Sequence, residues 1–190
     1  EDKVGAHGTD QLIGIEHLQF NDQTLPVGWF TKAANLPASE ILTIVDLYMA
    51  GLDRAPDAVG LAYWASQLAD GRNFGDISKS FFAAPEATAM YAPTSSAATF
   101  VEAAYISALG RAPDPAGGAY WINEIATGHI ARSDFITALI AGARAPSGSA
   151  TDAQYIANKE VVGAHFAITQ GLTNVEWARV VERGINASAE

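Results

Sequence analysis

A segment of eleven residues occurs twice in this chain and constrains its fold more than any other feature. Residues 54–64 read RAPDAVGLAYW and residues 111–121 read RAPDPAGGAYW, so eight of the eleven positions are identical at a separation of 57 residues. Tyr48 and Tyr105 repeat at the same separation. A long fixed period is typical of duplicated supersecondary units that pack together. The sequence therefore predicts two homologous units.

Each unit reads as three helices, because apolar residues recur in it at three- and four-residue spacing. The eleven-residue motif would start the second helix of each unit, and a glycine would end it. We expect the first helices over 39–51 and 97–109, the second helices to end near Gly71 and Gly128, and the third helices over 74–84 and 132–142.

Residues of the motif have the chemistry of helix ends. Asp57 and Asp114 precede the second helices and are expected to be N-caps, because a carboxylate accepts hydrogen bonds from free backbone N–H groups. Pro115 suits the first helical position, where the missing N–H costs nothing. Gly51 and Gly110 are expected to end the first helices in the left-handed conformation.

The last part of the chain lacks the motif and is expected to cover the end of the repeats. Asp152 would cap a long helix that runs to about residue 170, Gly171 would end it, and Asn174 would cap a final helix. The expected fold is mainly α, with a β tail over 1–30, helical repeats over 39–92 and 97–146, and a C-terminal helical cap over 151–188.

The motif Arg-x-Pro-Asp-x-x-Gly-x-x-Tyr-Trp resembles the signature of a domain-of-unknown-function family numbered four-two-one-four. Members of that family have tandem helical repeats and occur in large secreted or surface bacterial proteins, so the resemblance implies a context but no chemistry. It covers about residues 43–143, and the first copy departs from the pattern at Asp53 and Ala58. Its structural motif residues here are Arg54, Asp57, Gly60, Arg111, Asp114 and Gly117.

The stretch from Gly8 to Val27 mixes apolar residues with turn formers, which favours short strands over a helix. We expect a β-hairpin or a remnant of a β-roll. This stretch resembles the closing piece of the RTX (haemolysin-type) calcium-binding region of bacterial proteins exported by type I secretion. The matching residues are Gly8, Thr9, Asp10, Leu12, Ile15, Glu16, Leu18, Phe20, Asp22 and Thr24.

Two groups of acidic residues are candidate calcium ligands. Asp10, Glu16 and Asp22 supply the oxygen donors that Ca²⁺ prefers, although Asp10 and Asp22 would equally serve as turn residues. Asp53 and Asp57 form a dense acidic pair in one loop and could bind Ca²⁺ weakly, with helix capping as the alternative.

Two Tyr-Trp pairs are candidate ligand-binding residues. Trp64 and Trp121 could form platforms for a sugar ring, or they could anchor the core of each repeat, since they lie on the apolar stripe of the second helix. Tyr63 and Tyr120 are expected nearer the surface.

The two arginines of the motif also allow two interpretations. Arg54 and Arg111 could bind an anion or a carboxylate ligand. Alternatively, each guanidinium could tie its loop to the carbonyls of a neighbouring helix, or to Asp57 and Asp114.

Composition excludes several classes of function. The chain has 21 acidic and 11 basic side chains, a net charge of −10 that disfavours nucleic acid and anionic membranes as partners. No apolar run of membrane-spanning length occurs, so membrane insertion is not expected. The absence of cysteine excludes disulfides, a thiol nucleophile and cysteine-bound zinc. Histidine pairs of the H-E-x-x-H type and a G-x-S-x-G elbow are also missing, so no enzyme is predicted.

Because the chain begins at Glu1, we expect it to be a piece of a larger protein. The two resemblances imply a non-catalytic, secreted or cell-surface module for extracellular structure, adhesion or carbohydrate contact. The alternatives are an accessory domain of a secreted polysaccharide-active enzyme and a calcium-dependent folding or secretion cap.

Overall fold

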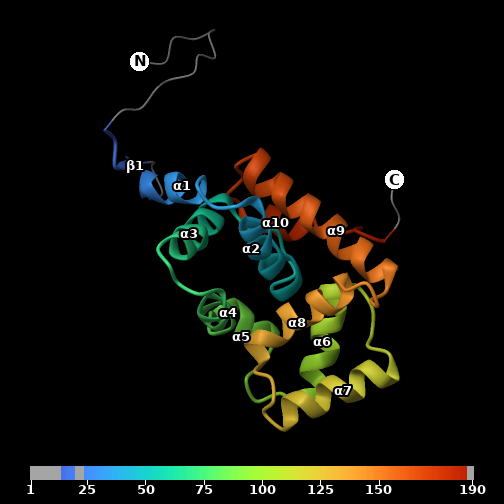
Figure 1. The fold of residues 1–190 in the computed structure, drawn as a ribbon. Coiled ribbons are helices and arrows are strands. Elements are labelled where there is room, and N and C mark those ends of the chain that lie inside the picture. Colours follow the sequence, from blue (N-terminus) through green and yellow to red (C-terminus); the bar gives the residue numbers. More distant parts are fainter. Residues whose placement is uncertain (1–13, 20–23, 188–190) are drawn as a thin grey trace.

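The computed structural model describes residues 14–19 and 24–187, and helices make up most of that part, as predicted (Figure 1). Every expected helix of the two repeats is present, with ends within two residues of the predicted ones where a range was predicted. The first repeat contains α2 (Ala38–Gly51), α3 (Ala58–Ala69) and α4 (Phe74–Phe82), and the second contains α6 (Ala97–Leu109), α7 (Pro115–Ala126) and α8 (Arg132–Arg144).

The second helices begin as the motif predicts. The Asp57 carboxylate accepts a hydrogen bond of 2.7 Å from the backbone N–H of Gly60. The Asp114 carboxylate accepts one of 2.8 Å from the N–H of Gly117, and Pro115 is the first residue of α7. The duplicated aspartates therefore have the same capping function in both repeats.

The first helices end differently from the prediction in one repeat. Gly110 is left-handed, with φ of 67°, as expected. Gly51, however, is still the last residue of α2, and the left-handed residue is Asp53, with φ of 49°. Asp53 precedes Gly110 by the repeat separation of 57 residues, and aspartate is one of the few residues that adopt this conformation. The prediction for Gly51 was wrong because the turn closes two residues later.

Helices of one repeat pack on the equivalent helices of the other, α2 on α6 and α4 on α8. The Ser107 hydroxyl donates a hydrogen bond of 2.7 Å to the carbonyl oxygen of Ala50, and these two residues are 57 apart. The Ser78 hydroxyl of α4 also donates to the carbonyl oxygen of Ser133 in α8. Contact between equivalent residues indicates that the repeats face each other across an approximate two-fold axis instead of stacking head to tail.

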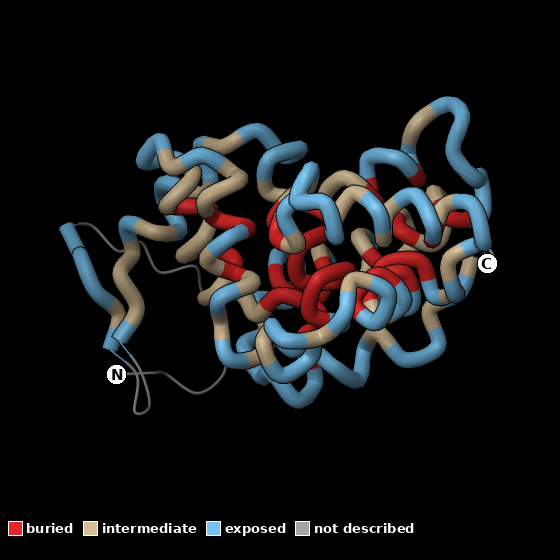
Figure 2. Tube along the Cα trace, turned by 90° about the horizontal axis from the view of Figure 1, so that it is seen from below, coloured by how far each residue is buried: buried red, intermediate tan, exposed pale blue. Residues whose placement is uncertain are grey.

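The core consists of two clusters of buried residues, which Figure 2 shows in the middle of the molecule. One lies in the first repeat and includes Ile44, Val45 and Ile77. The other lies in the second repeat and includes Phe100 and Phe135. Each repeat therefore has an apolar centre of its own.

The C-terminal part covers both repeats, whereas the sequence suggested a cover for the end of the array. It forms α9 (Ala150–Ala164), a π-helical turn (His165–Thr169) and α10 (Val175–Val180). Ile156 belongs to the core of the second repeat, but Phe166 and Ala178 belong to the core of the first. The backbone N–H of Ala55 also donates to the carbonyl oxygen of Ala178 at 2.9 Å. The last part of the chain thus returns to the first repeat.

Two predicted caps in this part had different outcomes. Asn174 caps α10 through a 2.9 Å bond from the N–H of Trp177, as expected. The N-cap of α9 is Ser149 and not Asp152, because the helix begins two residues before Asp152. Asp152 lies in the first turn instead, where it binds an arginine.

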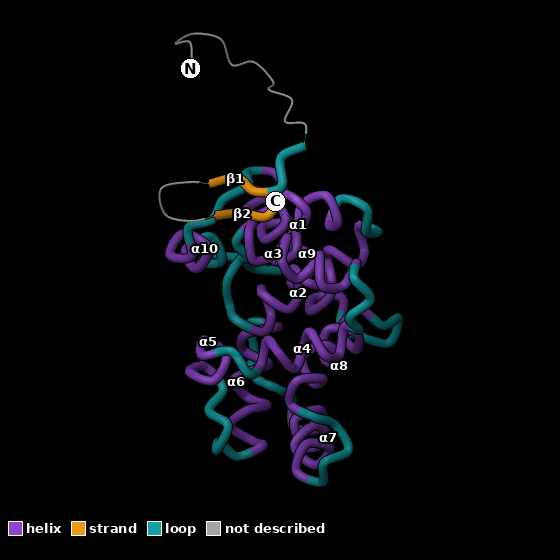
Figure 3. Tube along the Cα trace, turned by 90° about the vertical axis from the view of Figure 1, so that its left-hand side faces the viewer, coloured by secondary structure: helices purple, strands orange, loops and turns teal. Residues whose placement is uncertain are grey.

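The N-terminal region contains the predicted hairpin. Strands β1 (His17–Gln19) and β2 (Thr24–Pro26) pair antiparallel with Leu18 opposite Leu25, beside α1 at one end of the molecule (Figure 3). Helix α1 (Val27–Ala33) was not predicted, since residues up to 30 were assigned to the β tail. Helix α5 (Pro85–Met90) was also not predicted, and Pro85 occupies its first helical position.

Candidate functional site

The two copies of the motif build the same joint between distant helices. Nε and Nη2 of Arg54 donate to the carboxylate of Glu86, at 3.0 Å each. The same atoms of Arg111 donate to the carboxylate of Asp152, at 2.8 and 2.6 Å. In each case the acid lies in the first turn of the helix that follows the third helix of the repeat, α5 or α9. Each arginine therefore ties its motif loop to the next part of the chain.

These partners differ from the ones considered from the sequence. Arg54 does lie 3.5 Å from Asp57, but its paired hydrogen bonds go to Glu86. The acids follow their arginines by 32 and 41 residues, so the repeat separation could not reveal them. Nη1 of each arginine also donates to the carbonyl oxygen of the next residue, Ala55 or Ala112.

The environment of the two joints favours the charged forms. Partial burial works against ionisation of Glu86, but hydrogen bonds from Arg54 and Arg179 hold the pKa of its carboxyl below the ordinary value. The hydrogen bond to Asp152 raises the pKa of Arg111. Bidentate pairs of this kind fix the relative geometry of the two side chains as well as pairing their charges.

A tyrosine and a glycine complete each joint. The guanidinium of Arg54 lies 4.8 Å from the centre of the Tyr48 ring, and that of Arg111 lies 5.5 Å from the Tyr105 ring. Burial raises the pKa of both tyrosines. The tyrosine hydroxyls pack against Gly60 and Gly117, where an added Cβ would lie 2.5 and 3.1 Å from the hydroxyl oxygen. This packing gives a reason for the glycine of the motif.

The tryptophans of the motif pack into the two cores. The ring centroids of Trp64 and Phe81 are 5.6 Å apart, and those of Trp121 and Phe135 are 5.1 Å apart. Both indoles are partly buried against the core clusters, which is the placement expected of a core anchor.

The neighbouring tyrosines differ between the repeats. Each stands 4.9 Å from its tryptophan at nearly the same interplanar angle. Tyr63 also contacts Trp29 of α1, with 5.1 Å between the rings. Tyr120 is 56% exposed. Of the four aromatic candidates, Tyr120 thus presents the most open ring.

The candidate calcium ligands are not brought to one point in the part of the chain that is described. Asp10 and Asp22 lie outside the described residues, and Glu16 is exposed just before β1. Asp53 pairs with Lys159 at 3.3 Å, whereas Asp57 caps α3. Within residues 14–19 and 24–187, no group of three or more His, Cys, Asp or Glu side chains is placed to hold a metal ion.

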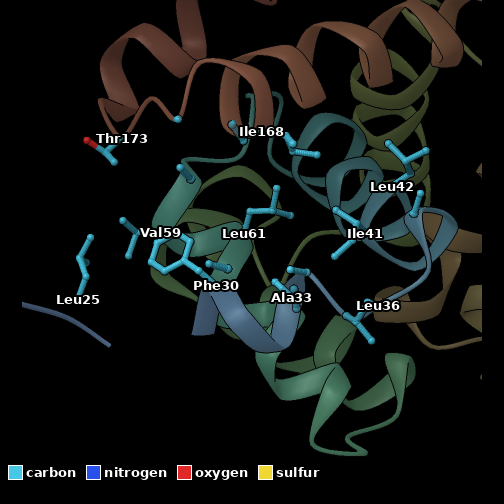
Figure 4. A pocket seen from close by; sticks show the side chains of 17 residues that line it. Leu25, Phe30, Ala33, Leu36, Ile41, Leu42, Val59, Leu61, Ile168 and Thr173 are labelled. Atoms are coloured by element: carbon cyan, nitrogen blue, oxygen red, sulfur yellow. The ribbon is translucent and has the colours of Figure 1, made fainter. Parts of the chain in front are cut away.

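A pocket of about 920 Å³ opens between α1, α2, α3 and the π-helical turn (Figure 4). Phe30, Ile41, Val59 and Ile168 point into it from these elements, and Leu36 does so from the loop between α1 and α2. Among the described residues, no titratable side chain lines the pocket and Thr173 is the only lining residue with a polar side chain, so the pocket can accept an apolar group. The sequence did not indicate this pocket, because it depends on α1 and on the return of the C-terminal part. No helix in the described ranges is long and apolar enough to cross a membrane.

The comparison with protein families identifies the second repeat. Residues 78–144, from within α4 to the end of α8, match the model of the family described as Domain of unknown function (DUF4214). The resemblance inferred from the motif is therefore confirmed for this part of the chain. No curated protein and no solved structure matches the chain.

Proposed function

We propose that this chain, whose residues 78–144 match DUF4214, is a non-catalytic module of a larger extracellular protein that serves in structure or adhesion. The observation that carries the proposal is the use of the motif in both repeats. Its arginine, aspartate and glycine all serve internal contacts, namely the ion pair, the helix cap and the tyrosine contact. A catalytic group has to reach its substrate, but these groups face other parts of the same chain.

The extracellular location rests on the sequence. Residues 8–24 resemble the end of an RTX calcium-binding region, and Asp10, Glu16 and Asp22 are the oxygen donors that would bind Ca²⁺ there. Thermal unfolding with Ca²⁺ and then with a chelator tests this part of the proposal. A higher melting temperature with Ca²⁺ is expected, and an unchanged one contradicts calcium binding.

Tyr120 is the residue that we propose contacts carbohydrate. Its ring is exposed on α7, and Trp121 holds it at 4.9 Å in an edge-on arrangement. A ring fixed in this way loses little conformational freedom when it stacks on a sugar. Figure 1 shows α7 at the opposite end of the molecule from α1.

A glycan array with the wild type and two variants tests this function. Tyr120→Ala should lose binding, whereas Tyr120→Phe keeps the ring and should retain it. Circular dichroism should be unchanged in both, because the side chain is exposed. Binding that survives in Tyr120→Ala would reject Tyr120 as the contact. No binding by the wild type would reject carbohydrate adhesion and leave the structural role.

A further inference from the structure

The end of the described chain is held on the molecule mainly by polar contacts. We call residues 175–187, which comprise α10 and the following turns, the C-terminal latch. Ala178 is fully buried and Ile185 is partly buried against the core of the first repeat, but Trp177 and Val180 are more than half exposed. Hydrogen bonds and ion pairs connect the latch to the rest of the protein. The hydrogen bonds join Ala55 to Ala178 and Asn158 to Asn186, and the ion pairs join Arg179 to Glu86 and Lys159 to Glu182. A segment with so few buried apolar contacts opens more readily than the core.

A cleft of about 810 Å³ lies where the latch meets α5, α6, α9 and the loop between α2 and α3. Acidic and basic side chains share its lining, in contrast to the apolar pocket near α1. The charged residues are Asp53, Glu86, Lys159, Arg179, Glu182 and Arg183.

One ammonium group faces two carboxyl groups in this cleft. The side chains of Lys159 and Glu182 are only 3% and 6% exposed. Nζ of Lys159 lies 3.3 Å from Glu182 and 3.3 Å from Asp53, and it donates to the carbonyl oxygen of Ser107 at 2.7 Å. Asp53 is 59% exposed, so water solvates its charge, whereas both carboxyl oxygens of Glu182 are buried and accept no hydrogen bond from the described residues. An ionised Glu182 would have to share the charge of Lys159 with Asp53, which is costly for a buried carboxylate.

Other groups near Glu182 do not supply the missing positive charge. Arg179 of the latch is paired with Glu86 of α5. Tyr91, which follows α5, has a buried hydroxyl whose pKa burial raises to about 12, so it is neutral. Arg183, also of the latch, lines the same cleft, but Lys159 is the only cation that forms an ion pair with Glu182 among the described residues.

We propose that the C-terminal latch closes firmly on the first repeat only while the buried Glu182 carries a proton, so that rising pH releases it. In the closed state Glu182 is neutral, and Lys159 balances the charge of Asp53. Loss of the proton leaves two negative charges beside one positive charge. The resulting repulsion drives apart the latch and the loop that carries Asp53.

The direction of the pH effect follows from the titration of Glu182. Burial raises the pKa of this carboxyl from 4.5 to about 8, against the opposing effect of Lys159 and with a further rise from Asp53. Closure is therefore strongest below pH 4.5, weakens between pH 4.5 and about 8, and levels off above that range. For one proton, the closing equilibrium falls by at most about tenfold per pH unit in that range.

Amide hydrogen exchange of the intact chain at pH 6 and pH 9, corrected for the intrinsic exchange rates, tests the proposal. Protection of residues 175–187 should fall at least tenfold between the two pH values. Protection of α8 should not change, since it lies outside the latch. In Glu182→Gln, which mimics the neutral acid, protection of the latch should be the same at both values. Glu176→Gln, an exposed change in the latch, should keep the wild-type fall.

A second variant decides the result if Glu182→Gln does not hold the latch closed. Asp53→Asn leaves Lys159 to pair with Glu182 alone, so the fall should become smaller, although burial of Glu182 remains. The proposal is overturned if wild-type protection of the latch is equal at pH 6 and pH 9. It is also overturned if the fall in Asp53→Asn is as large as in the wild type.

Discussion

Gly60 and Gly117 occupy equivalent positions in the two copies of the motif, and in each a tyrosine hydroxyl rests against the helix backbone. The space is tighter at Gly60, where an added Cβ would lie 2.5 Å from Tyr48 and 2.8 Å from Asp57. At Gly117 the corresponding contacts are 2.9 Å to Asp114 and 3.1 Å to Tyr105. A single methyl group therefore disturbs the cap and the tyrosine together.

We predict that Gly60→Ala lowers the free energy of unfolding by about 1–3 kcal/mol, because the methyl group overpacks this contact. Gly117→Ala should cost less. Urea denaturation measures both, with Gly142→Ala as the matched control. Gly142 lies inside α8, and a Cβ added there would meet no neighbouring atom within 4 Å. Alanine at this position should therefore stabilise the protein by up to about 1 kcal/mol. Equal stability of Gly60→Ala and Gly142→Ala would contradict the prediction.

Single residues were predicted well where their role is local. The caps at Asp57, Asp114 and Asn174 follow from each residue and its position before an apolar helix. Glu86, Asp152, Lys159 and Glu182 gave no such signal, because their partners are distant in sequence and tertiary packing brings them together. The residues of the motif itself could thus be predicted from the sequence, but their partners elsewhere in the chain could not.

At the scale of elements, the arginine joints connect each motif loop to the helix that follows its repeat. The first joint is the more buried at its arginine, since Arg54 is 8% exposed and Arg111 is 39% exposed. A buried guanidinium cannot exchange a lost partner for water as readily as an exposed one. The two joints therefore have the same geometry, but the first should contribute more to the stability of the protein.

Arg54→Lys should reduce stability by about 1.5–3 kcal/mol, because lysine keeps the charge but not the two parallel bonds to Glu86. Arg111→Lys should have a smaller effect. Chemical denaturation of both variants tests the order, and Lys79→Gln, at an exposed ion pair with Asp76, should stay within about 0.5 kcal/mol of the wild type. A larger loss for Arg111→Lys than for Arg54→Lys would refute the assignment.

Helices of the repeats were predicted within two residues from their periodicity and capping, and the short α10 was predicted from its Asn174 cap, but α1 and α5 were not predicted. Helix α1 has seven residues and α5 has six, too few for a helical period to stand out. Proline gives an ambiguous signal in α5, since it ends one helix and begins the next. Their positions depend on packing against α3 and α4, which the sequence does not show.

At the scale of the whole molecule, the C-terminal part joins the two repeats. Helix α9 packs on α2 of the first repeat and on α6 and α8 of the second. Gly163 allows a close crossing there, because an added Cβ would lie 2.7 Å from the sulfur of Met49. The repeats therefore share a covering element in addition to their direct contact.

We predict that the two repeats unfold in one transition. Calorimetry should give a calorimetric enthalpy equal to the van't Hoff enthalpy, and two resolved transitions would contradict this. Phe135→Ala, which removes a fully buried ring in the second repeat, should cost about 3–5 kcal/mol. Because both repeats unfold together, Phe135→Ala should lower the free energy of hydrogen exchange of the α4 amides in the first repeat by the same amount.

The bond between Ser107 and Ala50 joins equivalent positions of two units that lie on one chain. Two separate units with this contact would associate as a pair, and dilution would dissociate them. A covalent connection replaces that second-order association with an intramolecular one, whose effective concentration does not depend on how much protein is present. The paired arrangement should therefore persist when the protein is highly dilute.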